Sequence, residues 1–273
     1  MNNDVDTFLA SHPYAETTIR TYKFILNRLI TEYDPAIMTA INLVTFVRKQ
    51  EWGNSRQCVA LAASQKFIGW KYGATHAAMQ AKIKRIVGKP QRALDNNNAL
   101  KLLASFNPHV AKGARDLALC ALALDTGLRC SELCRLALKD VDLNHNSLEV
   151  IVKGGKWAAA VFAPQTGAHI SQWLAFRKTN GDSLFTNTWS GKQLTPEGLN
   201  SIVKQWGRVI GIKLSPHDLR RTFATIATEA GAPERILMEG GRWSNSQMIQ
   251  RYTRSLKLEG MRKYLPTLRI GNT

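Results

Sequence analysis

The chain has 273 residues, of which 44% are hydrophobic, and it carries a formal net charge of +17 with an isoelectric point near 10.0. This length is enough for two domains with separate cores, and the hydrophobic fraction is typical of a globular protein rather than a disordered one. A charge of this size predicts a polyanionic partner, either nucleic acid or an anionic membrane surface.

The positive charge is distributed over both halves of the sequence. Residues 1–94 carry 13 Lys and Arg against 6 Asp and Glu, and the remaining residues carry 24 against 14. Each half therefore has its own excess of positive charge. This distribution indicates a clamp of two domains that both face the polyanion, rather than a basic tail on a neutral domain.

We expect neither a membrane protein nor a metalloprotein. The sequence has no run of about 18 apolar residues, and its first residues lack the pattern of a signal peptide. The cysteines lack the paired C-x-x-C spacing of a zinc site, so we expect free thiols in a reducing cytoplasm. The four cysteines are Cys58, Cys120, Cys130 and Cys134.

Residues 3–87 have a helical pattern throughout. Apolar residues recur at helical spacing in several segments, which breakers such as Asp34-Pro35 separate. We expect a bundle of four or five helices that includes Thr17–Tyr33, Ala40–Val47, Val59–Tyr72 and Ala77–Val87. The basic side chains of this bundle that we predict to contact phosphate groups are Arg20, Lys23, Lys66, Lys82 and Arg85.

A polar stretch around Gly88 and Pro90 has no periodicity and separates the two halves. We therefore place an all-helical first domain at residues 1–90, a linker at 91–98 and a second domain at 99–273. A basic linker between two basic domains is suited to run along a DNA backbone.

The second domain mixes helices with one β-hairpin. Leu148–Lys153 and Trp157–Ala163 alternate around a Gly-Gly pair, which predicts the hairpin, and Leu184–Thr186 is a candidate short strand. The expected fold is mainly α with a small β-sheet. The helices that we predict are Ala99–Phe106, Ala114–Leu124, Arg129–Leu138, Thr195–Ile210, Ser215–Glu229, Pro233–Glu239, Ser244–Arg254 and Lys257–Tyr264.

The sequence SPHDLRRT, which begins at Ser215, has the signals of a helix N-terminus. Ser215 is a suitable N-cap, Pro216 fits the first helical position, and Asp218 occupies the capping-box position. His217 and Arg220 are three residues apart, so they lie on one face near the positive end of the helix. This arrangement predicts a site that holds a phosphate.

Four sequence boxes, taken in order, resemble those of the tyrosine recombinase (phage integrase) family, in its two-domain Cre/Xer-like form. Each box alone is weak, but the ordered set is specific and extends from residue 99 to about residue 264. The first half matches the family's core-binding domain only in type and size. The boxes are TGLRCSEL at 126–133, VKGGK at 152–156, HDLRRTFA at 217–224, and GGRW at 240–243 followed by Tyr252.

The resemblance implies how this chain would break a DNA phosphodiester. Tyr252 would be the nucleophile that forms a 3′-phosphotyrosyl link, and it needs help because a free tyrosine ionises near pH 10. Arg129 and Arg220 would hold the phosphate and stabilise the transition state. Lys153 would protonate the leaving 5′-oxygen as general acid, with Lys156 on the same hairpin as the alternative.

Further side chains would support this reaction. His217 would donate a hydrogen bond or accept the tyrosine proton, and Glu132 would brace Arg129 or His217. Position 243 departs from the family's usual histidine: the indole of Trp243 can donate a hydrogen bond to a phosphate oxygen but cannot act as an acid or base. Two neighbouring arginines are expected to be non-catalytic phosphate contacts, Arg221 and Arg242.

The resemblance implies a site-specific DNA recombinase that acts on double-stranded DNA through a Holliday junction, for integration, excision or resolution. It implies a tetramer on two DNA sites, leaves room for accessory proteins, and requires no metal or cofactor. Lys257–Tyr264 is a candidate for docking onto a neighbouring subunit. We expect a cytoplasmic location, in a prokaryotic nucleoid or in the host cell of a virus or mobile element. The alternatives are a type IB topoisomerase-like enzyme that relaxes DNA, and a DNA-binding protein without catalysis.

Overall fold

The computed structural model describes residues 2–86, 93–152, 155–179, 181–243 and 245–246. The chain divides into two compact units, residues 1–88 and residues 89–273. Several predictions lie outside the described residues: Lys153, Tyr252, and the helices predicted at Ser244–Arg254 and Lys257–Tyr264.

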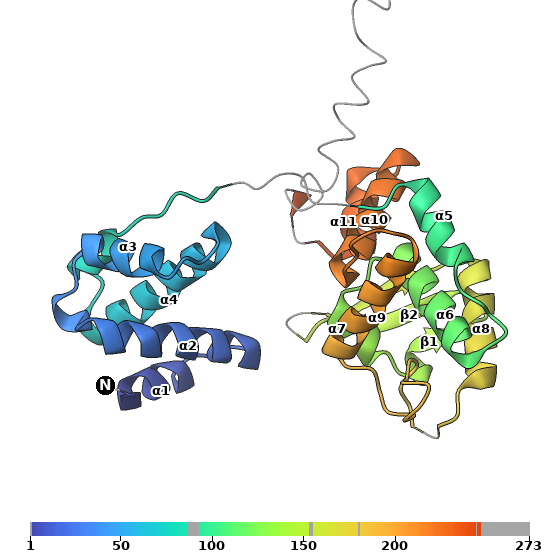
Figure 1. Cartoon of the computed structure of the whole chain (residues 1–273), viewed down its shortest axis with the longest axis horizontal. Helices are drawn as coiled ribbons and strands as arrows, with labels where there is room; N and C mark the ends of the chain where they lie inside the picture. Colours follow the sequence, from blue (N-terminus) through green and yellow to red (C-terminus); the bar gives the residue numbers. More distant parts are fainter. Residues whose placement is uncertain (1, 87–92, 153–154, 180, 244, 247–273) are drawn as a thin grey trace, which may run out of the picture. The chain divides into compact units, whose positions relative to one another are not determined.

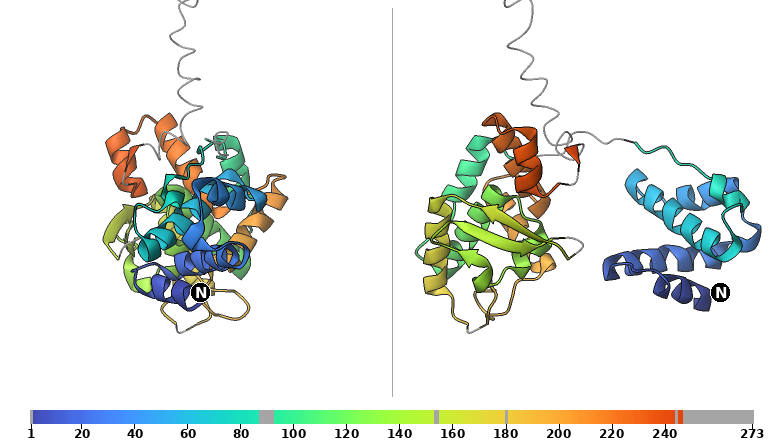
Figure 2. Two further views of the ribbon diagram at one scale, coloured as in Figure 1. Left: turned by 90° about the vertical axis from the view of Figure 1, so that its left-hand side faces the viewer. Right: turned by 180° about the vertical axis from the view of Figure 1, so that it is seen from behind.

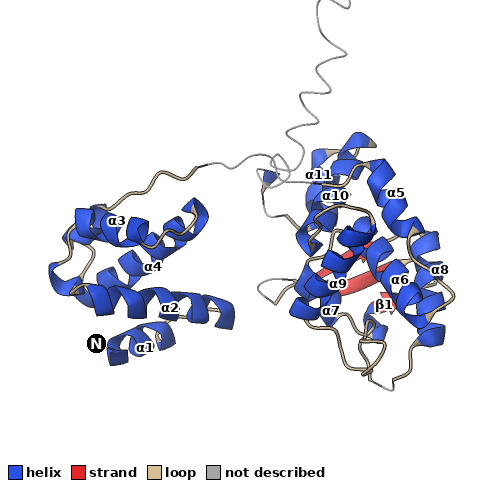
Figure 3. Ribbon diagram, viewed as in Figure 1, coloured by secondary structure: helices blue, strands red, loops and turns tan. Residues whose placement is uncertain are grey.

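The first unit is a helical bundle, as Figures 1 and 3 show. The apolar residues that recur at helical spacing are buried, among them Ile25 and Leu29, and they pack with Phe8, Phe46 and Phe67 in one core. The helices among its described residues are α1 (Asn2–Ala10), α2 (Glu16–Glu32), α3 (Ala40–Lys49) and α4 (Asn54–Tyr72), and the short 3₁₀ turns are η1 (Pro35–Ile37) and η2 (Ala77–Gln80).

The helix predicted at Ala77–Val87 is wrong. Only its first four residues form a turn, η2, and the described residues that follow are not helical. Two side chains of α4 form hydrogen bonds with backbone groups that would bond to one another within a helix. Gln65 donates to three carbonyl oxygens of this segment at 3.0–3.3 Å, and Asn54 accepts from the N–H of Ile86 at 2.7 Å. These tertiary contacts outweigh the local helical preference.

The second unit packs helices against a small antiparallel sheet with strand order β1-β2-β3. In α6, residues 113–123 are buried without a break, which makes it the central helix. The helices are α5 (Asn96–Ala104), α6 (Ala111–Thr126), α7 (Cys130–Arg135), α8 (Pro164–Phe176), α9 (Pro196–Val209), α10 (Pro216–Glu229) and α11 (Glu234–Gly241), with a 3₁₀ turn, η3 (Leu138–Asp140). The strands are β1 (Val141–Asp142), β2 (Ser147–Ile151) and β3 (Trp157–Val161).

The predicted hairpin is present as β2 and β3. Leu148 pairs with Ala160 and is buried, as is Val150 two residues further along β2, whereas Glu149 between them is exposed. The sheet therefore packs one face on the helices and leaves the other face open, which Figure 2 shows in its right-hand view. The mainly helical fold with a small sheet is confirmed.

Local predictions in the second unit differ from the structure in three places. α5 begins at Asn96, inside the predicted linker, because the Asp95 side chain caps it by accepting from the N–H of Asn98 at 2.7 Å. α7 ends at Arg135 rather than at residue 138, where a 3₁₀ turn follows. Residues 184–186 form no strand, because Thr186 makes only an isolated bridge to Gln193, as Ser183 does to Ala137 just before them.

Two elements were missed by the sequence analysis. β1 has only two residues, too few to show an alternating pattern. α8 begins after Ala163, which has no side chain able to cap a helix, so Pro164 at its first position is the single local start signal. Its position is fixed by tertiary contacts instead, since Asp125 of α6 accepts from the N–H of Ala163 at 2.9 Å and from the hydroxyl of Thr166 at 2.6 Å.

Candidate active site

The turn between α6 and α7 positions Arg129. Gly127 ends α6 with φ of 57°, a left-handed conformation that favours glycine, and a Cβ there would lie 2.5 Å from the ring of Phe223. Arg129 is then the N-cap residue of α7. The Glu132 carboxylate, whose side chain is 1% exposed, accepts from the Arg129 backbone N–H at 2.8 Å and from its guanidinium at 2.7 Å. The charged end of Arg129 is thereby fixed at the start of α7.

The N-terminus of α10 carries the other predicted phosphate-binding side chains. Asp218 accepts from the backbone N–H of Ser215 at 2.8 Å and from its hydroxyl at 2.6 Å, so the predicted helix start is confirmed. The other Asp218 oxygen accepts from Arg221 at 2.7 Å. His217 is exposed at this end of the helix, and Arg220, one turn further on, is buried.

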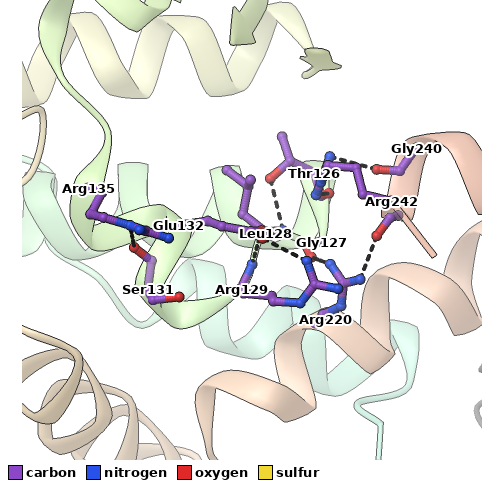
Figure 4. A network of polar contacts seen from close by, with 11 residues as sticks. Thr126, Gly127, Leu128, Arg129, Ser131, Glu132, Arg135, Arg220, Gly240 and Arg242 are labelled. Carbon is purple, nitrogen blue, oxygen red and sulfur yellow. Dashed lines mark hydrogen bonds and ion pairs between the residues drawn. The ribbon is translucent and has the colours of Figure 1, made fainter. Parts of the chain in front are cut away.

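Arg220 connects two turns of the second unit. Its guanidinium donates to the carbonyl of Gly127, after α6, and to the carbonyl of Gly241 at the end of α11. The same guanidinium lies over the indole of Trp243, with 4.6 Å from its carbon to the ring centroid. Figure 4 shows Arg129 and Arg220 close to the turn at Gly127. Two guanidinium groups from different helices thus meet at this turn.

The guanidinium of Arg242, a predicted phosphate contact, is held by backbone carbonyl groups. Its guanidinium donates to the carbonyls of Thr126 and Gly240, each at 2.7 Å, which Figure 4 also shows. Burial lowers the pKa of Arg242, as does the nearby charge of Arg129, whereas Glu132 opposes that shift. The other predicted non-catalytic contact, Arg221, is occupied by its ion pair with Asp218, and its side chain is 12% exposed.

The pKa of His217 is lower than that of an ordinary histidine. Partial removal of the ring from water is the main cause, and the charges of Arg221, Arg220 and Arg129 add to it, with Asp218 opposing. The lowered pKa favours the neutral form of the imidazole. A neutral imidazole has one nitrogen that can accept a proton and one that can donate a hydrogen bond.

The structure brings together five of the predicted site residues: Arg129, Glu132, His217, Arg220 and Trp243. Sequence reasoning missed the carbonyl groups that hold the buried arginines, at Thr126, Gly127, Gly240 and Gly241. The Gly-Gly pair at 240–241 was a signal for one of these turns, because a Cβ on Gly241 would lie 2.0 Å from the Trp243 ring.

The predicted phosphate contacts of the first unit differ in their surroundings. Arg20 pairs with Glu16 at 2.9 Å and Lys23 with Asp6 at 2.6 Å, so an anion would compete with a carboxylate for each. The ammonium of Lys66 lies over the ring of Tyr14, 5.4 Å from its centroid. Within the described residues, no ion pair with a carboxylate is formed by Lys82 or Arg85.

In the part of the chain that the structure describes, no helix is both long and apolar enough to cross a membrane. The same part contains no group of three or more His, Cys, Asp or Glu side chains placed to hold a metal ion. The four cysteines are free thiols.

Comparison with known proteins gives consistent matches. Residues 92–259 match the family model described as "Phage integrase family". The tyrosine recombinase XerA of Pyrococcus horikoshii is 28% identical over 254 residues, which cover 91% of this chain and 86% of the relative. The tyrosine recombinase XerC of Corynebacterium efficiens is 30% identical over 252 residues, which cover 88% of this chain and 81% of the relative.

Two solved structures share the fold. The XerH site-specific recombinase, in a post-cleavage complex with palindromic difH substrate, aligns with a TM-score of 0.73 at 21% identity, covering 90% of this chain and 78% of that one. A lambda integrase (75–356) dimer bound to a COC′ core site aligns with a TM-score of 0.74 at 14% identity, covering 92% and 94%.

Proposed function

The chain belongs to the phage integrase family, and from this premise we propose that it is a tyrosine recombinase that cuts and rejoins double-stranded DNA in site-specific recombination. The observation that supports the chemistry most directly is the meeting of Arg129 and Arg220 at the Gly127 turn. Guanidinium groups held in this way can neutralise the non-bridging oxygens of a phosphate without reorganising during the reaction.

We propose the following cleavage step. The Tyr252 oxygen attacks phosphorus, a phosphotyrosyl bond forms to the 3′ side, and the bond to the 5′-oxygen breaks. Neutral His217 takes up the tyrosine proton, and Lys153 gives a proton to the leaving 5′-oxygen, with Lys156 as the alternative donor. Attack by the 5′-hydroxyl of a partner strand then reverses the step and exchanges the strands.

The other side chains of the site act on binding and position. Trp243 offers an indole N–H for a phosphate oxygen and packs its ring against Arg220. Glu132 holds Arg129 in place. No metal ion is part of this proposal, because the arginines supply the positive charge that a cation supplies elsewhere.

DNA binding is proposed for both units, because each has an excess of positive charge. Lys66, Lys82 and Arg85 are the preferred phosphate contacts of the first unit, since Arg20 and Lys23 are already paired with carboxylates. A tetramer on two DNA sites is part of the same proposal, as are integration, excision or resolution as its biological outcome.

Covalent capture tests the proposal. The full chain is mixed with nicked duplexes drawn from DNA that flanks its own gene, then denatured, with Tyr252→Phe in parallel. We expect a protein–DNA adduct that the variant does not form, and sequencing of the trapped DNA would give the target site. An adduct that persists in the variant would identify a different nucleophile. Tight binding without any adduct would favour a DNA-binding protein without catalysis.

A further inference from the structure

Arg242 has a backbone conformation that arginine rarely adopts. It follows the last residue of α11 with φ of 53° and ψ of 46°, in the left-handed region. Only two other non-glycine residues in the described part of the chain have a positive φ. A side chain with a Cβ is disfavoured there, so its presence calls for a compensating interaction.

The compensation comes from the guanidinium of Arg242. One nitrogen donates to the carbonyl of Gly240 in the last turn of α11, and another donates to the carbonyl of Thr126, the last residue of α6. These carbonyls lie at the negative ends of two helices and lack helical donors of their own. One planar group therefore joins the ends of α6 and α11.

Arg220 makes the adjacent pair of contacts. It bonds the carbonyls of Gly127 and Gly241, each one residue beyond those that Arg242 bonds. The same two turns are thus held twice, by Arg220, which is also proposed to bind phosphate, and by Arg242. When Arg220 binds a phosphate, the contacts of Arg242 still hold the two turns together.

We propose that Arg242 is a positioning residue for strand cleavage and not a phosphate ligand. The turn that it holds at Thr126 leads within three residues to Arg129, and the turn at Gly240 leads directly to Trp243. The bridge therefore fixes the spacing between two groups that are proposed to contact the same phosphate. This inference rests on the proposed function for its effect on cleavage, but its structural part does not.

Two variants separate positioning from phosphate binding. Arg242→Gly removes the bridge while relieving the left-handed backbone, and Arg242→Lys keeps the charge but offers a single nitrogen in place of the planar fork. We expect the single-turnover rate of adduct formation at saturating protein to fall about 10–100-fold in both, as for other groups that orient an active residue. DNA affinity and its salt dependence should stay close to those of the original chain.

Arg235→Ala is the matched control. Arg235 lies on α11, the helix that Arg242 follows, and it is exposed and pairs only with Glu239 at 3.4 Å among the contacts of the described residues, so its loss should leave the cleavage rate unchanged. A phosphate ligand at position 242 would behave differently. Arg242→Gly would then weaken DNA binding and reduce the salt slope by about one, and Arg242→Lys would restore most of the affinity. That pattern would overturn the inference.

Hydrogen exchange of the DNA-free chain tests the bridge without any reaction. The N–H of Trp243 bonds the carbonyl of Met238 at 2.9 Å, and the N–H of Gly127 bonds that of Ala123 at 3.0 Å. We expect both amides to exchange faster in Arg242→Gly and Arg242→Lys, and neither to change in Arg235→Ala. Unchanged exchange would refute the bridge. If the original chain forms no adduct with any duplex, the proposed function fails while this measurement still decides the role of Arg242.

Discussion

The carboxylate of Glu132 binds Arg129 at two points, one oxygen accepting from its backbone N–H and the other from its guanidinium. The backbone contact fixes the start of α7, and the side-chain contact fixes the direction of the charged group. A single buried carboxylate thus sets both where α7 begins and where the guanidinium of Arg129 points.

Glu132→Gln tests this double contact. The amide can accept from one N–H but presents its own NH₂ group to the other donor, so one contact becomes unfavourable. We expect the rate of adduct formation to fall about 10–100-fold, with a smaller change in DNA affinity. Glu149→Gln, on the open face of the sheet, is the control and should leave the rate unchanged. Equal rates for Glu132→Gln and the original chain would show that Arg129 needs no such support.

The lowered pKa of His217 predicts how the rate depends on pH. If the neutral imidazole accepts the tyrosine proton, the rate is constant above the pKa of His217 and falls as the pH drops through it, below the ordinary value near 6.5. Arg221→Gln removes a positive charge and leaves Asp218 unpaired, and both changes raise this pKa. We therefore expect the acidic limb to move to higher pH in Arg221→Gln.

Proton NMR of the His217 ring, alongside the rate profile, checks this assignment. The titration midpoint and the limb of the profile should move together in Arg221→Gln. A limb that stays fixed while the midpoint moves would show that a group other than His217 controls the rate. Lys23→Gln, in the other unit, is a control of equal charge change and should shift neither.

The side chains of the site were more predictable from the sequence than the backbone groups that hold them in place. Short-range signals carry most of the information at α10, where Ser215, Pro216 and Asp218 mark a helix start that the structure contains at the expected residue. The grouping of Arg129 with His217 was expected only through the family resemblance, because nothing local relates residues so far apart. The carbonyl groups that hold Arg220 and Arg242 could not be predicted, since every residue has one.

The wrong and missed predictions in the fold also come from contacts between residues that are far apart in the sequence. The residues at 77–87 have helical spacing, but Gln65 and Asn54 of α4 take their backbone groups. α8 lacks a capping side chain and is positioned by Asp125, which lies 38 residues before Ala163 in the sequence. Periodicity describes which face a segment buries, whereas contacts between distant residues decide whether it forms a helix.

Gly127→Ala tests the turn that carries Arg129. Alanine must adopt a left-handed φ and would place its Cβ 2.5 Å from the Phe223 ring. We expect the free energy of unfolding to fall by about 2–4 kcal/mol, measured by denaturant unfolding of the full chain. Gly211→Ala isolates the backbone cost, because Gly211 has φ of 73° and nothing within 4 Å of its Cβ position. Equal losses in the two variants would show that the Phe223 contact is harmless.

Thr222→Val tests how the chain entering the second unit is attached to α10. The Thr222 hydroxyl accepts from the N–H of Leu94 at 2.8 Å and donates to the carbonyl of Asp218 at 2.9 Å, and both Thr222 and Leu94 are buried. Valine keeps the shape but leaves the Leu94 N–H without its acceptor, at a cost of about 1–3 kcal/mol in unfolding free energy.

The control for this attachment is Thr228→Val on the same helix. The Thr228 hydroxyl donates to the carbonyl of Ala224 at 2.7 Å within α10, so its removal leaves no distant donor unsatisfied and should cost less than about 0.5 kcal/mol. Hydrogen exchange at Leu94 should accelerate only in Thr222→Val. Because Thr222 lies one turn beyond Asp218, which caps α10 beside His217, a loosened attachment should also slow adduct formation. A Thr222→Val chain that loses stability but keeps its full cleavage rate would show that the segment at Leu94 is anchored to α10 without influencing the site.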